Sequence, residues 1–237
     1  MSDKTEILAR LEKHYFDARP GLHYRNAFEL LMATMLSAQT TDRQVNLVTQ
    51  TLFQECPDAK SMLALGQEAL ESRIKSCGFY RTKAAHMLAT CRILVEKYGG
   101  EVPRTLEELS ALPGVGRKTA NVVLSNAFGI PALAVDTHVF RVANRLGLAR
   151  AKNVLETEKQ LMEAIPRDKW SAAHHWLIWH GRRICDARRP KCPECFLNDL
   201  CPWGGKTVSR CLSIKPEYSS KRGTAATAAS LSARRST

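Results

Sequence analysis

Hydrophobic residues recur along most of the chain at the three- and four-residue spacing of an α-helix, and no strand-like alternation of useful length interrupts them. In the first strong segment, one helical face carries Phe28, Leu31, Met32, Met35 and Leu36. Comparable periodic segments follow one another as far as residue 180. The pattern therefore predicts an all-α protein.

Capping signals and glycines place the ends of these helices. Three pairs of residues have the spacing of a capping box, in which two side chains close the first turn of a helix: Thr41 with Gln44, Thr105 with Glu108, and Asn153 with Glu156. Further helices are predicted over 81–98, 117–128 and 168–180, with Gly99 ending the first and Gly181 ending the third.

The formal net charge of +12 is concentrated in two places. Residues 206–237 contain seven basic side chains and one acidic one, so half of the excess lies in this C-terminal extension. A second concentration, with five basic side chains and one aspartate, lies between Arg182 and Lys191 beside several cysteines. Such surfaces bind polyanions because each neutralised phosphate releases counterions. A solvated basic face without a ligand is the alternative.

The chain carries no sign of a membrane or export segment. No stretch reaches the roughly 18 apolar residues that span a bilayer, and residues 1–15 are charged and lack the hydrophobic region of a signal peptide. Residues 204–237 mix small, hydroxyl and basic residues without a period, which predicts a disordered basic tail. We expect a cytoplasmic, nucleoid-associated protein whose eight cysteines are free thiols or metal ligands.

Four of the cysteines form a compact array after the last predicted helix. Intervals of six, two and five residues separate Cys185, Cys192, Cys195 and Cys201. Four thiolates within 17 positions suit a cubane iron–sulfur cluster or a tetrahedral zinc ion. The spacing favours a metal site over free thiols but does not separate iron from zinc. No such spacing relates the others, which are interpreted as ordinary thiols: Cys56, Cys77, Cys91 and Cys211.

A tight turn between two predicted helices contains the tripeptide Gly114-Val115-Gly116. Glycine reaches positive φ without steric cost, and backbone N–H groups at the start of the next helix point outward as an anion-binding nest. A simple helical hairpin without a ligand is the alternative. The preceding proline and the basic pair Arg117-Lys118 favour a helix-hairpin-helix motif that holds a phosphate.

Lys118 and Asp136 are the candidate catalytic residues. Lys118 falls in the first turn of a predicted helix, where the helix dipole and the neighbouring Arg117 disfavour its positive charge. A neutral lysine amine can attack a sugar carbon and form a Schiff base, although a phosphate contact or a solvated charge is the ordinary alternative. Asp136, or Thr137 beside it, is suited to cap the helix that ends near Gly147.

The chain resembles the endonuclease III family from about residue 25 to residue 203, through four separated signatures in the same order. These are Leu36-Ser37-Ala38-Gln39, the turn region 112–127, Val135-Asp136-Thr137-His138, and the cysteine array. The resemblance implies a bifunctional DNA glycosylase and abasic-site lyase of base excision repair that removes oxidised pyrimidines from double-stranded DNA. It also implies that the array binds a 4Fe-4S cluster and that the protein is a monomer.

The resemblance also implies roles for single residues. Lys118 attacks the sugar carbon that bears the damaged base, while Asp136 stabilises the positive charge on the sugar and helps to activate the amine. The resulting imine permits β-elimination of the 3′ phosphate. His138 either orients the Asp136 carboxylate or is a structural histidine.

Chemistry on that carbon requires the nucleotide to leave the base stack. Gln39, which falls at the junction of two predicted helices, resembles the residue that fills the gap in the duplex. Phe79 stands at the place of a second wedge, where other family members carry leucine; the alternative is a phenylalanine buried in the core. The hairpin residues Gly114, Val115 and Gly116 are expected to bind the DNA backbone.

The architecture implied by the resemblance has two helical lobes with DNA across the cleft between them. One lobe is continuous over 22–131, and the other combines 1–21 with 132–203. Two other functions compete with this one. A monofunctional glycosylase of the adenine type lacks a nucleophilic lysine, whereas a non-catalytic DNA-binding protein or electron carrier needs no combination of Gln39, Lys118 and Asp136.

Overall fold

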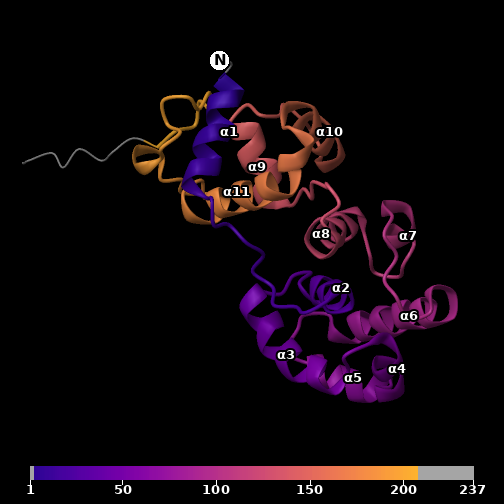
Figure 1. Cartoon of the computed structure of the whole chain (residues 1–237). Helices are drawn as coiled ribbons and strands as arrows, with labels where there is room; N and C mark the ends of the chain where they lie inside the picture. The colour runs from indigo at the N-terminus through magenta and orange to yellow at the C-terminus, as the bar shows by residue number, and fades with distance from the viewer. Residues whose placement is uncertain (1–2, 208–237) are drawn as a thin grey trace, which may run out of the picture.

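The computed structural model describes residues 3–207, and within that range it contains helices and no β-strand (Figure 1). In chain order the helices are α1 (Asp3–His14), α2 (Ala27–Leu36), α3 (Asp42–Glu55), α4 (Ala59–Leu65), α5 (Gln67–Ile74), α6 (Tyr80–Tyr98), α7 (Leu106–Ser110), α8 (Arg117–Phe128), α9 (Thr137–Arg145), α10 (Val154–Ala164), the 3-10 helix η1 (Arg167–Lys169), α11 (Trp170–Arg183) and the 3-10 helix η2 (Cys192–Glu194). The predicted all-α fold is confirmed.

Two separate hydrophobic cores divide the helices. The first is built by α2 to α8, with Leu31, Met62 and Val123 among its fully buried side chains. The second is built by α1, α9, α10 and α11 together with the segment after α11, and includes Leu11 and Leu177. Figure 1 shows the two groups as the lower and upper parts of the molecule, with α8 between them.

The segment between α8 and α9 joins the two cores. Ala132 and Ala134 pack into the first core, whereas Leu133 and Val135 pack into the second. Successive side chains of an extended segment point to opposite sides, so this short piece is shared by both halves of the molecule. It ends at Asp136, which is thereby held at the boundary between the two cores.

We propose that the two cores define lobes with the bounds expected from the resemblance, 22–131 and 1–21 with 132–203. The crossing from one to the other runs through the chain after α1 and through the 132–135 segment. The tail expected to be disordered, 204–237, lies outside the described residues from position 208 onward.

The predicted N-cap residues are found at the helix starts, but the second bond of a capping box forms at Asp58 and Ser61 of α4 and not at the three predicted pairs. In each case a side-chain oxygen accepts the N–H of the third helical residue, and the caps are Thr41, Thr105, Asp136 and Asn153. Helix α8 has the predicted bounds, and α6 begins one residue earlier than predicted. Local signals therefore placed most helix ends correctly.

The prediction that the last helix stops at Gly181 is wrong, because α11 continues to Arg183. A Cβ at Gly181 would lie 3.1 Å from the Cβ of His138 and 3.1 Å from a guanidinium nitrogen of Arg141. Both of these residues belong to α9, which packs against α11. Gly181 therefore permits a close approach of two helices instead of ending one.

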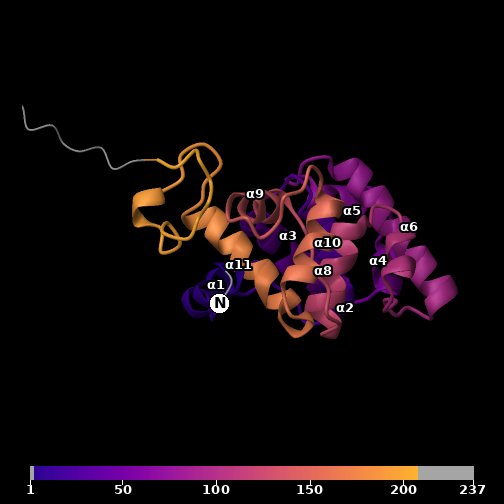
Figure 2. The ribbon, with the colours of Figure 1, turned by 90° about the horizontal axis from the view of Figure 1, so that it is seen from above.

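The cysteine-containing loop after α11 lies at one end of the molecule. Both views place it beyond α9 and α11 and far from α4 and α6 (Figure 2).

Among residues 3–207, no helix is long and apolar enough to cross a membrane.

Candidate active site

Lys118 and Asp136 line one small cavity, of about 80 Å³, between the two cores. Lys118 is the second residue of α8, and Asp136 is the residue before α9. The cavity wall also includes Asp42 at the start of α3 and, from α11, His174 and Arg182. The arrangement brings the two candidate catalytic residues, 18 positions apart in the sequence, to a shared space.

The pKa of Lys118 is lowered from its ordinary value, and burial of the amine among protein atoms is the largest cause. The nearby carboxylates of Asp136 and Asp42 oppose this shift, whereas Arg182 adds to it. The side chain nevertheless remains accessible to solvent. A lysine of this kind loses its proton more readily than a free one and is open to a substrate, as a nucleophilic amine must be.

The expected contribution of Arg117 to this shift is not found. The Arg117 guanidinium makes a two-pronged ion pair with the nearly buried Glu158 of α10, with its nitrogens 2.7 to 3.1 Å from the carboxylate oxygens. Arg117 is not among the causes of the Lys118 shift. Arg117 instead ties the hairpin helix α8 to the second core.

Asp136 is oriented by the backbone around it. Its Oδ1 accepts the N–H of Val139 at 2.8 Å, so the N-cap role predicted for it is present. The His138 ring faces another partner, since its Nδ1 lies 3.1 Å from a guanidinium nitrogen of Arg141. Of the two interpretations of His138, the structural one fits its surroundings.

Two histidines of α11 form an uncharged wall of the cavity. His174 Nδ1 donates to the carbonyl of Ala134 at 2.7 Å, and His175 Nε2 lies 2.9 Å from Oδ1 of Asn126. Burial lowers the pKa of His174 to about 4 and that of His175 to about 3. Both rings are therefore neutral near pH 7 and do not compete with Lys118 for the negative charge of Asp136.

Arg182 joins the two halves of the molecule at the cavity. Its guanidinium donates to Oδ2 of Asp42 at 2.9 Å, across a sequence separation of 140 residues. The sequence suggested that Arg182 and Arg183 belong to a basic surface beside the cysteines, but Arg183 stacks 3.9 Å above the ring of Trp179. Arg183 nonetheless remains exposed, as do Arg188, Arg189 and Lys191, so positive charge is present beside the cysteines.

The hairpin turn lies between α7 and α8. Gly114 has a φ of +75°, and Val115 is buried and anchors the turn in the first core. The Pro113 carbonyl accepts the hydroxyl of Thr90 at 2.9 Å, which ties the turn to α6. A Cβ at Gly116 would have nothing within 4 Å, so this side of the turn is open to a ligand.

Gln39 and Phe79 share an uncommon backbone geometry. Within residues 3–207 they are the two non-glycine residues with positive φ, 55° and 56° respectively. Gln39 is exposed, and Phe79 is 67% exposed. The alternative that Phe79 is a core residue is therefore wrong, because its side chain projects from the surface. Left-handed backbone in such residues is a feature of functional sites.

Cys185, Cys192, Cys195 and Cys201 all line one narrow cavity at the end of the second lobe. Polar groups contact the sulfur atoms there: Arg145 donates to Cys185 Sγ at 3.4 Å, and His180 Nε2 lies 3.6 Å from Cys195 Sγ. Within residues 3–207 no three potential ligands are arranged to hold a metal ion directly. Four thiols around a common space are a ligand set that fits an iron–sulfur cluster.

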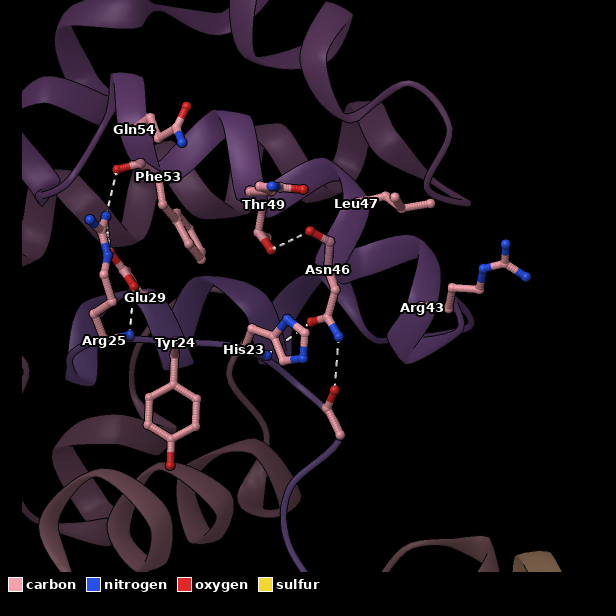
Figure 3. A pocket seen from close by; sticks show the side chains of 12 residues that line it. His23, Tyr24, Arg25, Glu29, Arg43, Asn46, Leu47, Thr49, Phe53 and Gln54 are labelled. Atoms are coloured by element: carbon pink, nitrogen blue, oxygen red, sulfur yellow. Dashed lines mark hydrogen bonds and ion pairs between the residues drawn. The ribbon is translucent and has the colours of Figure 1, made fainter.

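A larger cavity, of about 840 Å³, lies between residues 21–25 and α3 (Figure 3). Its one carboxylate, Glu29, is committed to Arg25, whose backbone N–H and Nε both donate to it. The Arg25 guanidinium also donates to the carbonyl of Phe53 at 2.8 Å. Among residues 3–207, no lysine lines this cavity, and its carboxylate is already paired with Arg25. We therefore assign the lysine chemistry to the smaller cavity of Lys118 and Asp136.

Comparison with known proteins agrees with this fold and identifies the family. Residues 32–167 match the family model of the HhH-GPD superfamily base excision DNA repair proteins, and residues 185–201 match the iron–sulfur binding domain of endonuclease III. The helical hairpin, the cavity and the cysteine loop thus define a helix-hairpin-helix protein of base excision DNA repair that binds an iron–sulfur cluster.

The chain is 47% identical to endonuclease III of Haemophilus influenzae over 203 residues, which cover 86% of this chain and 96% of that protein. It is 54% identical to endonuclease III of Bacillus subtilis over 186 residues, or 78% of this chain and 85% of that one. A trapped endonuclease III–DNA covalent intermediate matches the structure with a TM-score of 0.81 and 50% identity, over 85% of this chain and 97% of that one. The chain belongs to the endonuclease III family and is a bifunctional DNA glycosylase and abasic-site lyase.

Proposed function

We propose that this enzyme removes oxidised pyrimidines from double-stranded DNA with Lys118 as nucleophile and Asp136 as its acidic partner. The carrying observation is the cavity that both residues line, in which burial lowers the pKa of the lysine. An amine with a lowered pKa loses its proton more readily and can then attack carbon, and a carboxylate beside it can take up the proton.

The proposed reaction begins when the Lys118 nitrogen donates its electron pair to C1′ of the damaged nucleotide. The bond from C1′ to the base breaks, and the base leaves with that electron pair and gains a proton. The C1′–O4′ bond then breaks, O4′ keeps its electron pair and takes up a proton released by the Lys118 nitrogen, and the nitrogen forms a protonated imine with C1′. Loss of a proton from C2′ expels the 3′ phosphate with the electron pair of the C3′–O bond, which cleaves the strand.

Asp136 supports this sequence through its charge. Its carboxylate raises the pKa of Lys118, so it does not create the neutral amine, which results mainly from burial. We assign it instead to accepting the ammonium proton and to offsetting positive charge on the sugar as the bond to the base breaks. Its Oδ1 is held by the Val139 N–H, which fixes the carboxylate for both tasks.

The surrounding surfaces are proposed to bind and distort the duplex. Gly114, Val115 and Gly116 present the hairpin turn to a phosphate, while Gln39 and Phe79 enter the space left by the flipped nucleotide. We infer that the protein acts as a monomer in the compartment that holds the DNA. A cluster of the 4Fe-4S type, bound by the four cysteines, would fix the loop after α11 and hold Arg188 and Arg189 against the DNA backbone.

The test is a cleavage assay on duplexes that contain one thymine glycol. The parent should release the base and cut the strand, whereas Lys118→Gln should lose strand cleavage by at least about 1000-fold because no amine remains to form the imine. Asp136→Asn should retain weak activity, and the exposed Lys60→Gln serves as a matched control. Strand cleavage by Lys118→Gln at the parent rate would refute the proposal.

A further inference from the structure

Lys83 is a nearly buried lysine, 8% exposed, in the first turn of α6. Its Nζ donates hydrogen bonds to the carbonyls of Leu36 and Ala38 and to the hydroxyl of Thr40, at 2.8, 2.7 and 2.9 Å respectively. An ammonium group has three donors, and all three are used here. The acceptors are the last residue of α2 and two residues of the turn between α2 and α3, which carries Gln39.

The same lysine also contacts the loop that carries Phe79. Its backbone N–H donates to the Phe79 carbonyl at 3.0 Å. The loop that carries Phe79 also contacts the first turn of α3, because the Gln44 side chain donates to the hydroxyl of Ser76 at 2.8 Å. Lys83 therefore bonds to one loop through its side chain and to the other through its backbone.

The two loops form a single platform for the exposed residues at their tips. A Cβ at Gly78 would lie 3.6 Å from the Gln39 carbonyl oxygen, so the backbones at Gln39 and at Phe79 are close neighbours. Both residues hold left-handed backbone angles. Such angles cost energy for residues with a Cβ and persist only where the surroundings enforce them.

An ammonium suits this position for electrostatic reasons. Leu36 is the last residue of α2, and carbonyl oxygens at a helix end favour a cation. Burial lowers the pKa of Lys83, so the three acceptors offset a real desolvation cost. Lys83 is not among the residues that line the cavity of Lys118 and Asp136, so we assign it no direct part in the chemistry.

We propose that Lys83 is a positioning residue for nucleotide flipping, because it locks the Gln39 turn to the Phe79 loop so that both side chains enter the duplex as one rigid double wedge. This inference rests on the wedge roles proposed above for Gln39 and Phe79. Removing the ammonium frees the Gln39 turn while the cavity with Lys118 stays intact. The loss should therefore appear only where a nucleotide must leave a base stack.

The experiment compares strand cleavage at one abasic site within a duplex and within the same single strand. The holoenzyme variant Lys83→Met should lower kcat/KM on the duplex by about 100-fold, since small misplacement of positioning groups has effects of this size. The single strand needs no flipping, so its rate should stay within about twofold of the parent. The exposed Lys60→Met should change neither rate.

A spectroscopic signal and a second variant keep the test independent of folding. The fluorescence of a 2-aminopurine placed beside the abasic site should increase when the parent binds the duplex and stay low when Lys83→Met binds it. If Lys83→Met does not fold, Thr40→Val removes one of the three acceptors and should lower the duplex rate alone by about threefold to tenfold. Equal losses on duplex and single strand, or an unchanged duplex rate, would overturn the proposal.

Combining variants shows whether Lys83 acts through the wedges. Lys83→Met should add little to the defect of the double variant Gln39→Ala with Phe79→Ala, whereas additive losses would contradict a shared role. Should the double variant itself cleave the duplex at the parent rate, the wedge roles fail and this inference fails with them. That outcome differs from one in which the wedges matter and Lys83 does not.

Discussion

Replacing Gly114 by alanine should destabilise the hairpin turn for two separate reasons. The residue has a φ of +75°, which residues with a Cβ adopt at a cost of roughly 1–2 kcal/mol. The new Cβ would also lie 2.9 Å from the Cβ and from Nδ1 of His86 in α6. A contact with the His86 Cβ is not relieved by rotating that side chain, so the backbones must separate.

The combined loss is about 3 kcal/mol, if overpacking adds roughly 1–2 kcal/mol to the backbone cost. For a chain of this length each kcal/mol lowers the Tm by about 2–4 °C. Gly114→Ala should therefore melt about 6–12 °C below the parent. Thermal unfolding followed by circular dichroism at equal cluster content measures the difference.

Gly116→Ala is the matched control in the same turn. Gly116 has a φ of −89°, and a Cβ there would have open space, so only a weaker N-cap is expected, at about 0.5–1 kcal/mol. The added methyl would instead occupy the side of the turn open to a phosphate. Duplex affinity should fall about tenfold, as for one lost hydrogen bond to a charged group. Similar melting of Gly114→Ala and the parent would refute the steric argument.

Three further predictions follow from other parts of the molecule. The yield of Lys118 trapped on an abasic duplex should increase with pH, because the neutral amine reacts, and the midpoint should lie below the ordinary lysine pKa of about 10.4. Asp136→Asn should lower that midpoint further, because the carboxylate raises the pKa of Lys118. An upward shift of the midpoint would contradict the assigned charge effects. Urea unfolding should show a stability loss of about 2–3 kcal/mol for Arg117→Met and about 1 kcal/mol for Glu158→Gln, because only Arg117→Met leaves the buried Glu158 carboxylate without its partner. Neither variant should change the salt dependence of DNA binding. Cys192→Ser should abolish the visible absorbance of the cluster and make residues 184–207 sensitive to protease, while the first core stays folded. The loop should depend on the cluster because its described residues contain one short 3-10 helix and little other regular structure.

Local signals in the sequence predicted much of the fold. Caps such as Thr41 and Asn153 act within a single turn of helix, so the residues themselves specify the geometry. Gly181 shows where local signals fail. A glycine after a helical segment is a common signal for the end of a helix, and the sequence therefore predicted that the helix stops there. Here its function depends on α9, which lies far away in the sequence and cannot be seen in a local pattern.

Some residues around the site could be identified from local motifs in the sequence, and others only from the structure. Lys118 and Asp136 stand next to recognisable turn and cap motifs, which made them visible as candidates in the sequence. Lys83 stands in no motif, and its role depends on three acceptors about 45 residues earlier. Arg182 was interpreted as part of a basic surface because its partner, Asp42, is 140 residues away. Tertiary pairing, which no local pattern encodes, decided both cases.

The central claim is that Lys118 forms the covalent bond to the sugar. The most direct measurement is borohydride reduction of the holoenzyme on a duplex with one thymine glycol, followed by mass spectrometric mapping of the peptide that carries the nucleotide. The account predicts a single adduct on Lys118, absent from Lys118→Gln and present in Lys60→Gln. An adduct on another lysine, or base release by the parent without any adduct, would contradict it.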